Sequence, residues 1–265
     1  MLPKLIQVGN FYIPSYGVMV AIAFLTAIWV TTKLAARVGL NIEKVNNLAL
    51  GCAIAGMLGG KLAMFLFDWE IYSRDPSQIF SLSTLQSMGV FQGGVLLALV
   101  FAFWYMRRNG MPALVTSDVF APGLALGHGI GRIGCFLAGC CWGQSCDRPW
   151  AVQFSNPDAH EMTGVPLHVP LHPTQLYEAI AEFVIFAVLM AQFRKEHRPG
   201  AIIGLYLILY SIVRFVVEFV RHHEQALPFG LPLSLTQWIS LAMILLGAYL
   251  YVRASAVPQA RPSEA

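Results

Sequence analysis

Gly127-His128-Gly129-Ile130-Gly131-Arg132-Ile133-Gly134-Cys135-Phe136 places an arginine among small residues deep inside an apolar run. A guanidinium group at the centre of a bilayer costs about 2.5–3.5 kcal/mol on insertion scales, so it is rare unless it faces a helix bundle or a polar cavity. A second apolar run carries Arg214, Glu218 and Arg221 at helical spacing. Arginines on two different apolar runs predict an anion site inside a membrane.

The composition around these charges is that of a polytopic membrane protein. Hydrophobic residues make up 57% of the 265 residues, charged residues 12%, and the mean hydropathy is +0.61, which lies outside the usual range for a soluble domain. Runs of about 17–25 apolar residues can cross a bilayer as helices. We predict an all-α fold with seven transmembrane helices, at residues 11–32, 48–67, 89–105, 120–138, 176–193, 201–219 and 235–252.

The basic residues predict how these spans are oriented. Ten of the 17 Lys and Arg residues follow spans one, three, five and seven, four lie on the opposite side, and three lie within spans. By the positive-inside rule, the N-terminus is outside and the C-terminus is cytoplasmic. Membrane insertion therefore accounts for the net charge of +3, and no nucleic-acid partner is expected. The ten residues are Lys33, Arg37, Lys44, Arg107, Arg108, Arg194, Lys195, Arg198, Arg253 and Arg261.

The spans are expected to form one unit. No linker separates them, so we predict a single seven-helix membrane domain over residues 1–253. Polar stretches at 68–88 and 144–174 both fall outside in this topology and are expected to form a small external cap. Residues 254–265, rich in Ala, Pro and Ser, are predicted to be a disordered cytoplasmic tail. The first apolar run continues past any cleavage site, so it is expected to remain as a span.

The charged residues within spans suit the recognition of phosphate. Arg132 and Arg214 keep their protons in any protein environment, and their planar forks match phosphate oxygens. The alternative is structural pairing, of Arg214 with Glu218 one turn on and of Arg132 with Glu178 from another span. Lys61 either snorkels to the interface or points inward as a third cation.

Other polar and small residues in the spans allow two interpretations each. Gln175, Tyr177 and Glu178 lie in the first turn after Pro173, where helix capping alone accounts for them equally well. Tyr16 is either a site residue or an ordinary interfacial aromatic. Gly129-x-Gly131-x-x-Gly134 matches a dinucleotide fingerprint, but no βαβ unit surrounds it, so close helix packing or approach of a lipid headgroup is expected.

Four of the five cysteines crowd together as Cys135, Cys140, Cys141 and Cys146. The spacing is not a zinc pattern, so neither a metal nor a cofactor is predicted. A disulfide from Cys146 to Cys140 or Cys141 stays open, because this stretch ends on the predicted external side. Cys52 and Cys135 are interpreted as small packing residues.

The order of the motifs resembles the prolipoprotein diacylglyceryl transferase family. The match covers most of the chain and includes Tyr16-Gly17, Gly59-Gly60-Lys61, Phe91-Gln92-Gly93-Gly94, Gly131-Arg132-Ile133-Gly134 through Trp142-Gly143, His172-Pro173-Thr174-Gln175-Leu176-Tyr177-Glu178, Arg198-Pro199-Gly200, Tyr210, Arg214-Phe215-x-x-Glu218-x-x-Arg221 and Leu233-Ser234-x-x-Gln237-x-x-Ser240.

The resemblance implies a bacterial inner-membrane enzyme with its site towards the periplasmic or outer leaflet. Such an enzyme moves the diacylglyceryl group of phosphatidylglycerol onto the lipobox cysteine in the signal peptide of a preprolipoprotein, and glycerol 1-phosphate leaves. It further implies that Arg132 and Arg214 hold the phosphate and that Glu178 and Glu218 orient them. Substrate-binding positions implied by the motifs are Tyr16, Lys61, Gly93, Gly94, Gly131, Gly143, Gln175, Tyr177, Tyr210, Glu218 and Arg221.

The chain departs from the family pattern where proton transfer is concerned. Gln92 stands where the family has its candidate base, a histidine, and glutamine cannot take a proton. Cys135, Ala138 and Cys140 replace two Asn and a Glu of the signature, and Lys61 stands where arginine is common. His128, four residues before Arg132 on the same helix face, is therefore the candidate base, unless it only bonds to a neighbouring span.

Two other functions stay open on the sequence alone. One is a related phosphatidylglycerol-dependent transferase with another acceptor. The other is a lipid-binding membrane protein without catalysis, although no repeat architecture of the transporter kind is visible.

Overall fold

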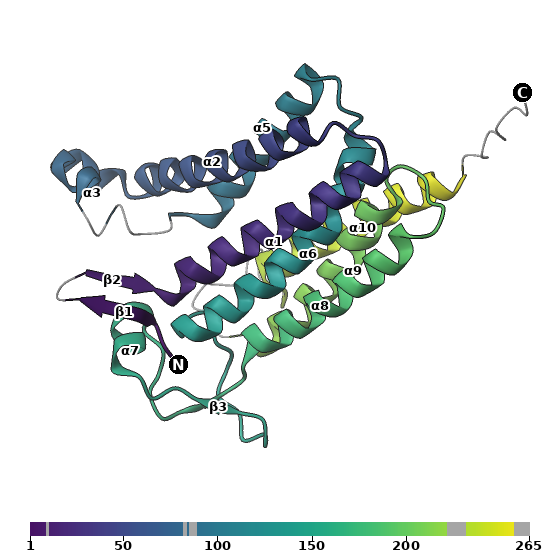
Figure 1. The fold of residues 1–265 in the computed structure, drawn as a ribbon. Helices are drawn as coiled ribbons and strands as arrows, with labels where there is room; N and C mark the ends of the chain where they lie inside the picture. Colours follow the sequence, from purple (N-terminus) through teal and green to yellow (C-terminus); the bar gives the residue numbers. More distant parts are fainter. Residues whose placement is uncertain (9–10, 82–83, 85–88, 222–231, 257–265) are drawn as a thin grey trace, which may run out of the picture. The chain divides into compact units, whose positions relative to one another are not determined.

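A computed structural model of the protein describes residues 1–8, 11–81, 84, 89–221 and 232–256. Each of the seven predicted apolar runs coincides with a long helix (Figure 1). Five of the described helices, namely α1, α2, α8, α10 and α9 with the turn after it, are long and apolar enough to cross a membrane. The seven long helices are α1 (Ser15–Arg37), α2 (Ile42–Phe67), α5 (Phe91–Arg108), α6 (Ala113–Ala138), α8 (Thr174–Phe193), α9 (Ala201–Val217) and α10 (Leu235–Ala256).

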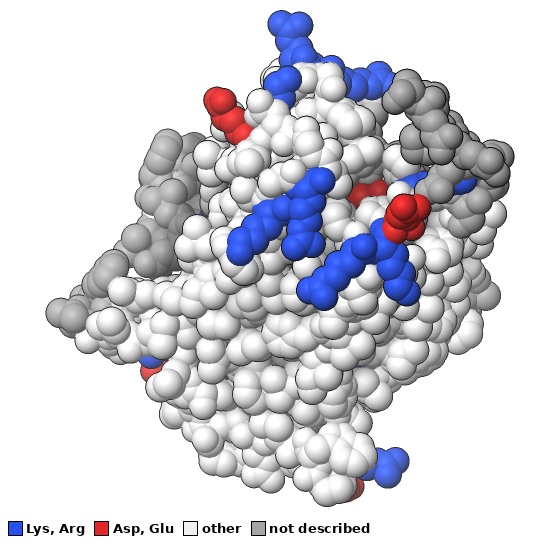
Figure 2. Space-filling view, turned by 45° about the vertical axis from the view of Figure 1, so that its right-hand side comes forward, with Lys and Arg blue, Asp and Glu red and all other residues white. Residues whose placement is uncertain are grey.

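Many of the exposed side chains on these helices are large and apolar, as contact with lipid favours. Phe67 of α2 is 79% exposed and Leu245 of α10 is 72% exposed. Figure 2 shows a face on which Lys and Arg gather in one part while broad areas carry no charged residue. A helical protein with apolar outer surfaces is what the composition predicted.

The chain forms two compact units. One contains residues 1–31 and 117–265, with most of α1 and α6 and all of α8, α9 and α10. The other contains residues 32–116, with α2, α5, α3 (Trp69–Arg74) and the 3₁₀ helix η1 (Pro76–Phe80). Each unit is described by itself, and the single seven-helix domain over residues 1–253 stays a prediction.

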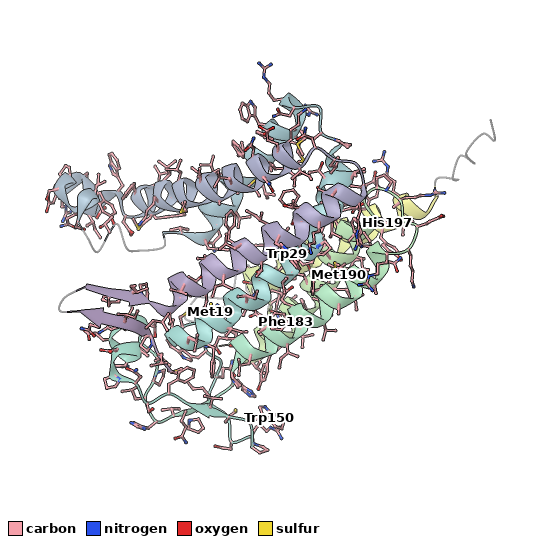
Figure 3. All side chains as sticks on the ribbon, in the orientation of Figure 1. Met19, Trp29, Trp150, Phe183, Met190 and His197 are labelled. Carbon is pink, nitrogen blue, oxygen red and sulfur yellow. The ribbon has the colours of Figure 1, made fainter. Side chains whose placement is uncertain are left out.

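Glycines set the spacing of helices within both units. In the smaller unit, a Cβ atom on Gly59 of α2 would lie 2.4 Å from the carbonyl oxygen of Gly93 on α5. In the larger unit, a Cβ atom on Gly134 of α6 would lie 2.9 Å from Met19 Cβ of α1, and one on Gly129 would lie 2.8 Å from the ring of Phe183 of α8 (Figure 3). Small residues allow these close approaches, as is usual in membrane bundles.

Asp118 of α6 anchors the start of α9. Its Oδ2 atom accepts a hydrogen bond of 2.6 Å from the Gly200 amide, and its Oδ1 atom accepts one of 2.8 Å from the Ile203 amide. The carboxylate is 2% exposed. It thereby satisfies two of the free N–H groups at the first turn of α9, which has no capping side chain of its own.

The first span begins later than predicted. A short antiparallel hairpin of β1 (Lys4–Val8) and β2 (Phe11–Pro14) precedes α1, which begins at Ser15. The predicted start at residue 11 is therefore wrong. Residues 11–14 are apolar enough to extend the run in the sequence, but their backbone groups pair with β1 rather than with α1.

The stretch 144–174, predicted as part of a cap, folds as a small substructure of the larger unit. It contains β3 (Val152–Gln153), α7 (Pro157–Thr163) and β4 (Pro170–Leu171) around a core of Phe154, Ala159, Val165 and Leu171. Lys4 of the hairpin reaches α7 through an ion pair of 2.9 Å with Asp158. This ion pair raises the pKa of Lys4, chiefly through its hydrogen bond to Asp158.

At the C-terminus, α10 extends through Ala256, so the first three residues of the predicted disordered tail are helical. The remainder of that tail, residues 257–265, lies outside the described residues.

Candidate functional site

A buried carboxylate on α8 lies at the centre of the charged cluster. Glu178 is 3% exposed, and its Oε2 atom lies 2.7 Å from Arg132 Nη2 of α6. Its Oε1 atom lies 3.5 Å from Arg214 Nη1 of α9 and 3.9 Å from Arg221 Nη1. Arg214 Nη2 is also 2.7 Å from Glu218 Oε2, in the 3₁₀ turn η2 (Glu218–Val220). Both ion pairs of the structural alternative are therefore present.

Pairing alone does not account for the number of cations. Three guanidinium groups share two carboxylates in this cluster, and their side chains are 14%, 12% and 22% exposed for Arg132, Arg214 and Arg221. Because Glu178 contacts all three, each arginine is oriented and still has donors to spare. Such an arrangement can bind a phosphate group with bidentate hydrogen bonds.

His128 joins the cluster to a third buried carboxylate. The Arg132 Nε–H group donates to His128 Nε2 over 3.2 Å, and His128 Nδ1 lies 2.9 Å from Glu182 Oε1 of α8. Glu182 is 1% exposed. His128 thus contacts a neighbouring helix, as the alternative to a base role expected, and the lone pair of Nε2 is engaged by Arg132.

Aromatic residues flank the arginines. The Tyr210 ring of α9 lies 5.4 Å from the His128 ring, and the two are tilted by 56°. The Tyr16 ring approaches α6 at Gly134, where a Cβ atom would lie 3.6 Å from Tyr16 Cδ2. Gly131, beside Arg132, has open space around its missing side chain. Tyr210 and Gly131 therefore lie beside the arginine cluster.

The loop after α6 is bonded to the segment that carries Arg221. Gly143 pairs with Arg221 in an isolated bridge, and the Gln144 amide donates to the Val220 carbonyl over 2.8 Å. A Cβ atom on Gly143 would lie 2.6 Å from that same carbonyl oxygen. Gly143 is thus needed for close backbone packing, independently of any contact with substrate.

Two predicted site residues at the start of α8 make contacts within the protein. Gln175 is fully buried, and its Nε2 donates to the Cys140 carbonyl over 2.6 Å. The Tyr177 hydroxyl lies 3.1 Å from His172 Nδ1. Both hold the loops around the arginine cluster.

Four predicted site residues lie in the smaller unit. Gly93 and Gly94 of α5 pack against α2, where a Cβ atom on Gly94 would lie 2.8 Å from the Gly56 carbonyl oxygen. Gln92 is exposed in the first turn of α5. Lys61 of α2 donates a hydrogen bond to the Thr84 carbonyl.

The crowded cysteines form a cluster of free thiols. The Sγ atoms of Cys135, Cys140 and Cys141 all lie within 4.8 Å of one another. Cys146 is also free, so the disulfide considered from the sequence is not formed. Hydrogen bonding by Cys135 and Cys140 lowers the pKa of the Cys141 thiol, and the positive charges of Arg221 and Arg132 act in the same direction.

Sequence reasoning missed Glu182 and the convergence of the thiols. A signal for Glu182 was available, because it lies one turn after Glu178 inside an apolar run, where a second carboxylate needs a partner. The thiols converge because the loop after α6 turns back at Gly139, whose φ is +83°. The cysteine spacings by which zinc sites are recognised in a sequence do not predict that turn.

Comparisons with known proteins agree with the motif order. The family model for prolipoprotein diacylglyceryl transferase matches residues 3–253. A phosphatidylglycerol–prolipoprotein diacylglyceryl transferase of Clostridium tetani is 32% identical over 251 residues, which cover 95% of this chain and 97% of that protein. Proteins of the same name from Vibrio parahaemolyticus and Photobacterium profundum are each 35% identical, covering 94% of this chain and 89% and 91% of their own lengths. The chain belongs to the prolipoprotein diacylglyceryl transferase family.

Proposed function

We propose that this protein transfers the diacylglyceryl group of phosphatidylglycerol to the lipobox cysteine in the signal peptide of preprolipoproteins. The observation that carries this proposal is the buried cluster in which Glu178 contacts three arginines, two of which, Arg132 and Arg214, lie on long apolar helices. The names of the similar proteins supply the substrate class. The related transferase with another acceptor and the non-catalytic lipid-binding protein are tested by the same experiment.

The arginines bind the phosphodiester in this proposal. The acceptor sulfur attacks the glycerol carbon that bears the phosphodiester oxygen, the carbon–oxygen bond breaks, and its electron pair leaves with glycerol 1-phosphate. Arg132 and Arg214 hold the phosphate and stabilise the charge of the leaving group, with Arg221 at the edge of the cluster. Charges fixed in place before the reaction stabilise developing charge without reorganisation.

The carboxylates and His128 position the arginines. Glu178 and Glu218 orient the guanidinium planes, and His128, held by Glu182, accepts the Nε–H hydrogen bond of Arg132. A base role for His128 requires Arg132 to release this hydrogen bond when it turns to the phosphate. Tyr16 and Tyr210 border the headgroup site.

The family motifs also include residues of the smaller unit. By motif position alone, we keep Lys61, Gln92, Gly93 and Gly94 as candidate substrate-binding residues. Gln92 is exposed and acts as a hydrogen-bonding residue, because an amide cannot remove a proton.

The proposed location is the bacterial inner membrane. Seven spans, an external N-terminus and a cytoplasmic C-terminus place residues 144–174 outside, so the site lies towards the outer leaflet. The apolar helices and the bias of the basic residues support this arrangement.

One assay tests the function. Purified protein is incubated with glycerol-labelled phosphatidylglycerol and a lipobox peptide, and thioether product is measured by mass spectrometry. A peptide with serine in place of the cysteine is the control and should give no product. Release of glycerol phosphate without peptide labelling would point to another acceptor, and lipid binding without turnover would point to a non-catalytic protein.

A further inference from the structure

Three thiols converge where α6 ends and its following loop turns back. Cys135 is buried in the last turns of α6, and Cys140 and Cys141 are half-buried in the loop. Their Sγ atoms lie within 4.8 Å of one another. In a tetrahedral site with Zn–S distances of about 2.3 Å, sulfur atoms lie about 3.8 Å apart. Shifts of about 1 Å or less would therefore bring all three sulfurs to a single zinc ion.

The backbone of this loop is held by the fully buried start of α8. Thr174 Oγ1 donates to the Cys141 carbonyl over 2.8 Å, and Gln175 Nε2 donates to the Cys140 carbonyl over 2.6 Å. Cys141 has a φ of +62°, which is unfavourable for a residue with a side chain. Such a conformation persists where the surroundings fix it, and it often marks a functional position. These hydrogen bonds thus hold the main chain of the loop in the conformation that brings the three thiols together.

Two guanidinium groups lie near the thiol cluster. The positive charges of Arg221 and Arg132 act on Cys141. The bridge between Gly143 and Arg221 ties the thiol loop to the arginine cluster. Three thiolates and Zn²⁺ together carry one negative charge, which these guanidinium groups offset. The thiol cluster and the anion site are therefore neighbours within one unit.

The proposed reaction needs an ionised acceptor thiol. A thiol with a pKa near 8.5 is only about 3% thiolate at pH 7. His128 Nε2 accepts from Arg132, and Glu178 and Glu218 are paired with arginines. Within this cluster of described residues, each candidate base is engaged. Coordination to zinc deprotonates a thiol without a protein base.

We propose that Cys135, Cys140 and Cys141 bind one Zn²⁺ ion and leave its fourth coordination position to the acceptor thiol. Catalytic zinc sites have three protein ligands and one open position. The acceptor loses its proton to water as its sulfur binds zinc, and this sulfur then forms the bond to the glycerol carbon while the carbon–oxygen bond to phosphate breaks. Zinc keeps its oxidation state throughout. The acceptor role rests on the proposed function, whereas metal binding does not.

Metal binding is tested on the full-length protein, purified in detergent and reduced. Excess Zn²⁺ should protect Cys135, Cys140 and Cys141 from alkylation, read by peptide mass spectrometry, while Cys52 and Cys146 of the same molecule serve as internal controls. Co²⁺ should give thiolate charge-transfer and tetrahedral d–d bands. The C140S and C141S variants should weaken Zn²⁺ binding by about 100-fold or more, whereas C146S should not. Equal alkylation of the three cysteines with and without Zn²⁺ would overturn the proposal.

The acceptor role is tested with a peptide. A lipobox peptide should shift the Co²⁺ bands, and its serine counterpart should not. If the cysteine peptide leaves the bands unchanged, the acceptor thiol does not take the fourth coordination position. Full transfer activity in metal-free protein would also refute this inference while leaving the proposed function intact. Shifted bands without any thioether product would instead refute the proposed function and leave the metal site standing.

Discussion

At the scale of single residues, the planar fork of a guanidinium is the property on which the anion site depends. Arg132→Lys and Arg214→Lys keep the positive charge but lose the planar fork, which contacts Glu178 and can bind a phosphate with two hydrogen bonds. We expect each change to lower kcat/KM by about 100-fold or more. Arg194→Lys, at an exposed position after α8, is the matched control and should behave as wild type. Near-normal turnover of both site variants would show that these two arginines have only a structural role.

His128 allows its positioning and base roles to be separated by pH. If it orients Arg132 through the Nε2 hydrogen bond, His128→Ala should lower the transfer rate by about tenfold at every pH between 6 and 9. The measurement is a full pH–rate profile of wild type and variant. A loss that shrinks as pH rises through the thiol pKa would make His128 the general base and would remove the need for zinc in ionising the acceptor.

At the scale of elements, Asp118 of α6 makes a specific contribution to the start of α9. Asp118→Ala would leave the Gly200 and Ile203 amides buried without acceptors, which costs about 1–3 kcal/mol. We expect a lower Tm in detergent, with a smaller decrease for Asp118→Asn, whose amide oxygen keeps one acceptor. A Tm of Asp118→Ala equal to that of wild type would show that water satisfies these amides.

The elements also show what a sequence can predict. Each of the seven apolar runs contains a long helix, because the length of an apolar run is a local property of the sequence, although residues 11–14 of the first run form a strand. Arg132 and Arg214 stood out for a similar local reason, since charge inside an apolar run is visible without a structure. The hairpin before α1, the Asp118 bonds across 82 and 85 residues and the meeting of three thiols were not predicted. Each depends on pairing between segments that no short window contains.

At the scale of the whole molecule, the distribution of basic residues predicts which side of the membrane each loop occupies. Ten Lys and Arg residues fall on one side and four on the other. Reporter fusions after Arg108 and after Arg198 should therefore read cytoplasmic, and a fusion within residues 147–168 should read external. That segment belongs to the unit that holds Glu178 and its three arginines, so its side sets the leaflet from which phosphatidylglycerol and the acceptor thiol arrive. A cytoplasmic signal from the 147–168 fusion, with the Arg108 fusion reading external, would invert the topology and move the proposed reaction to the inner leaflet.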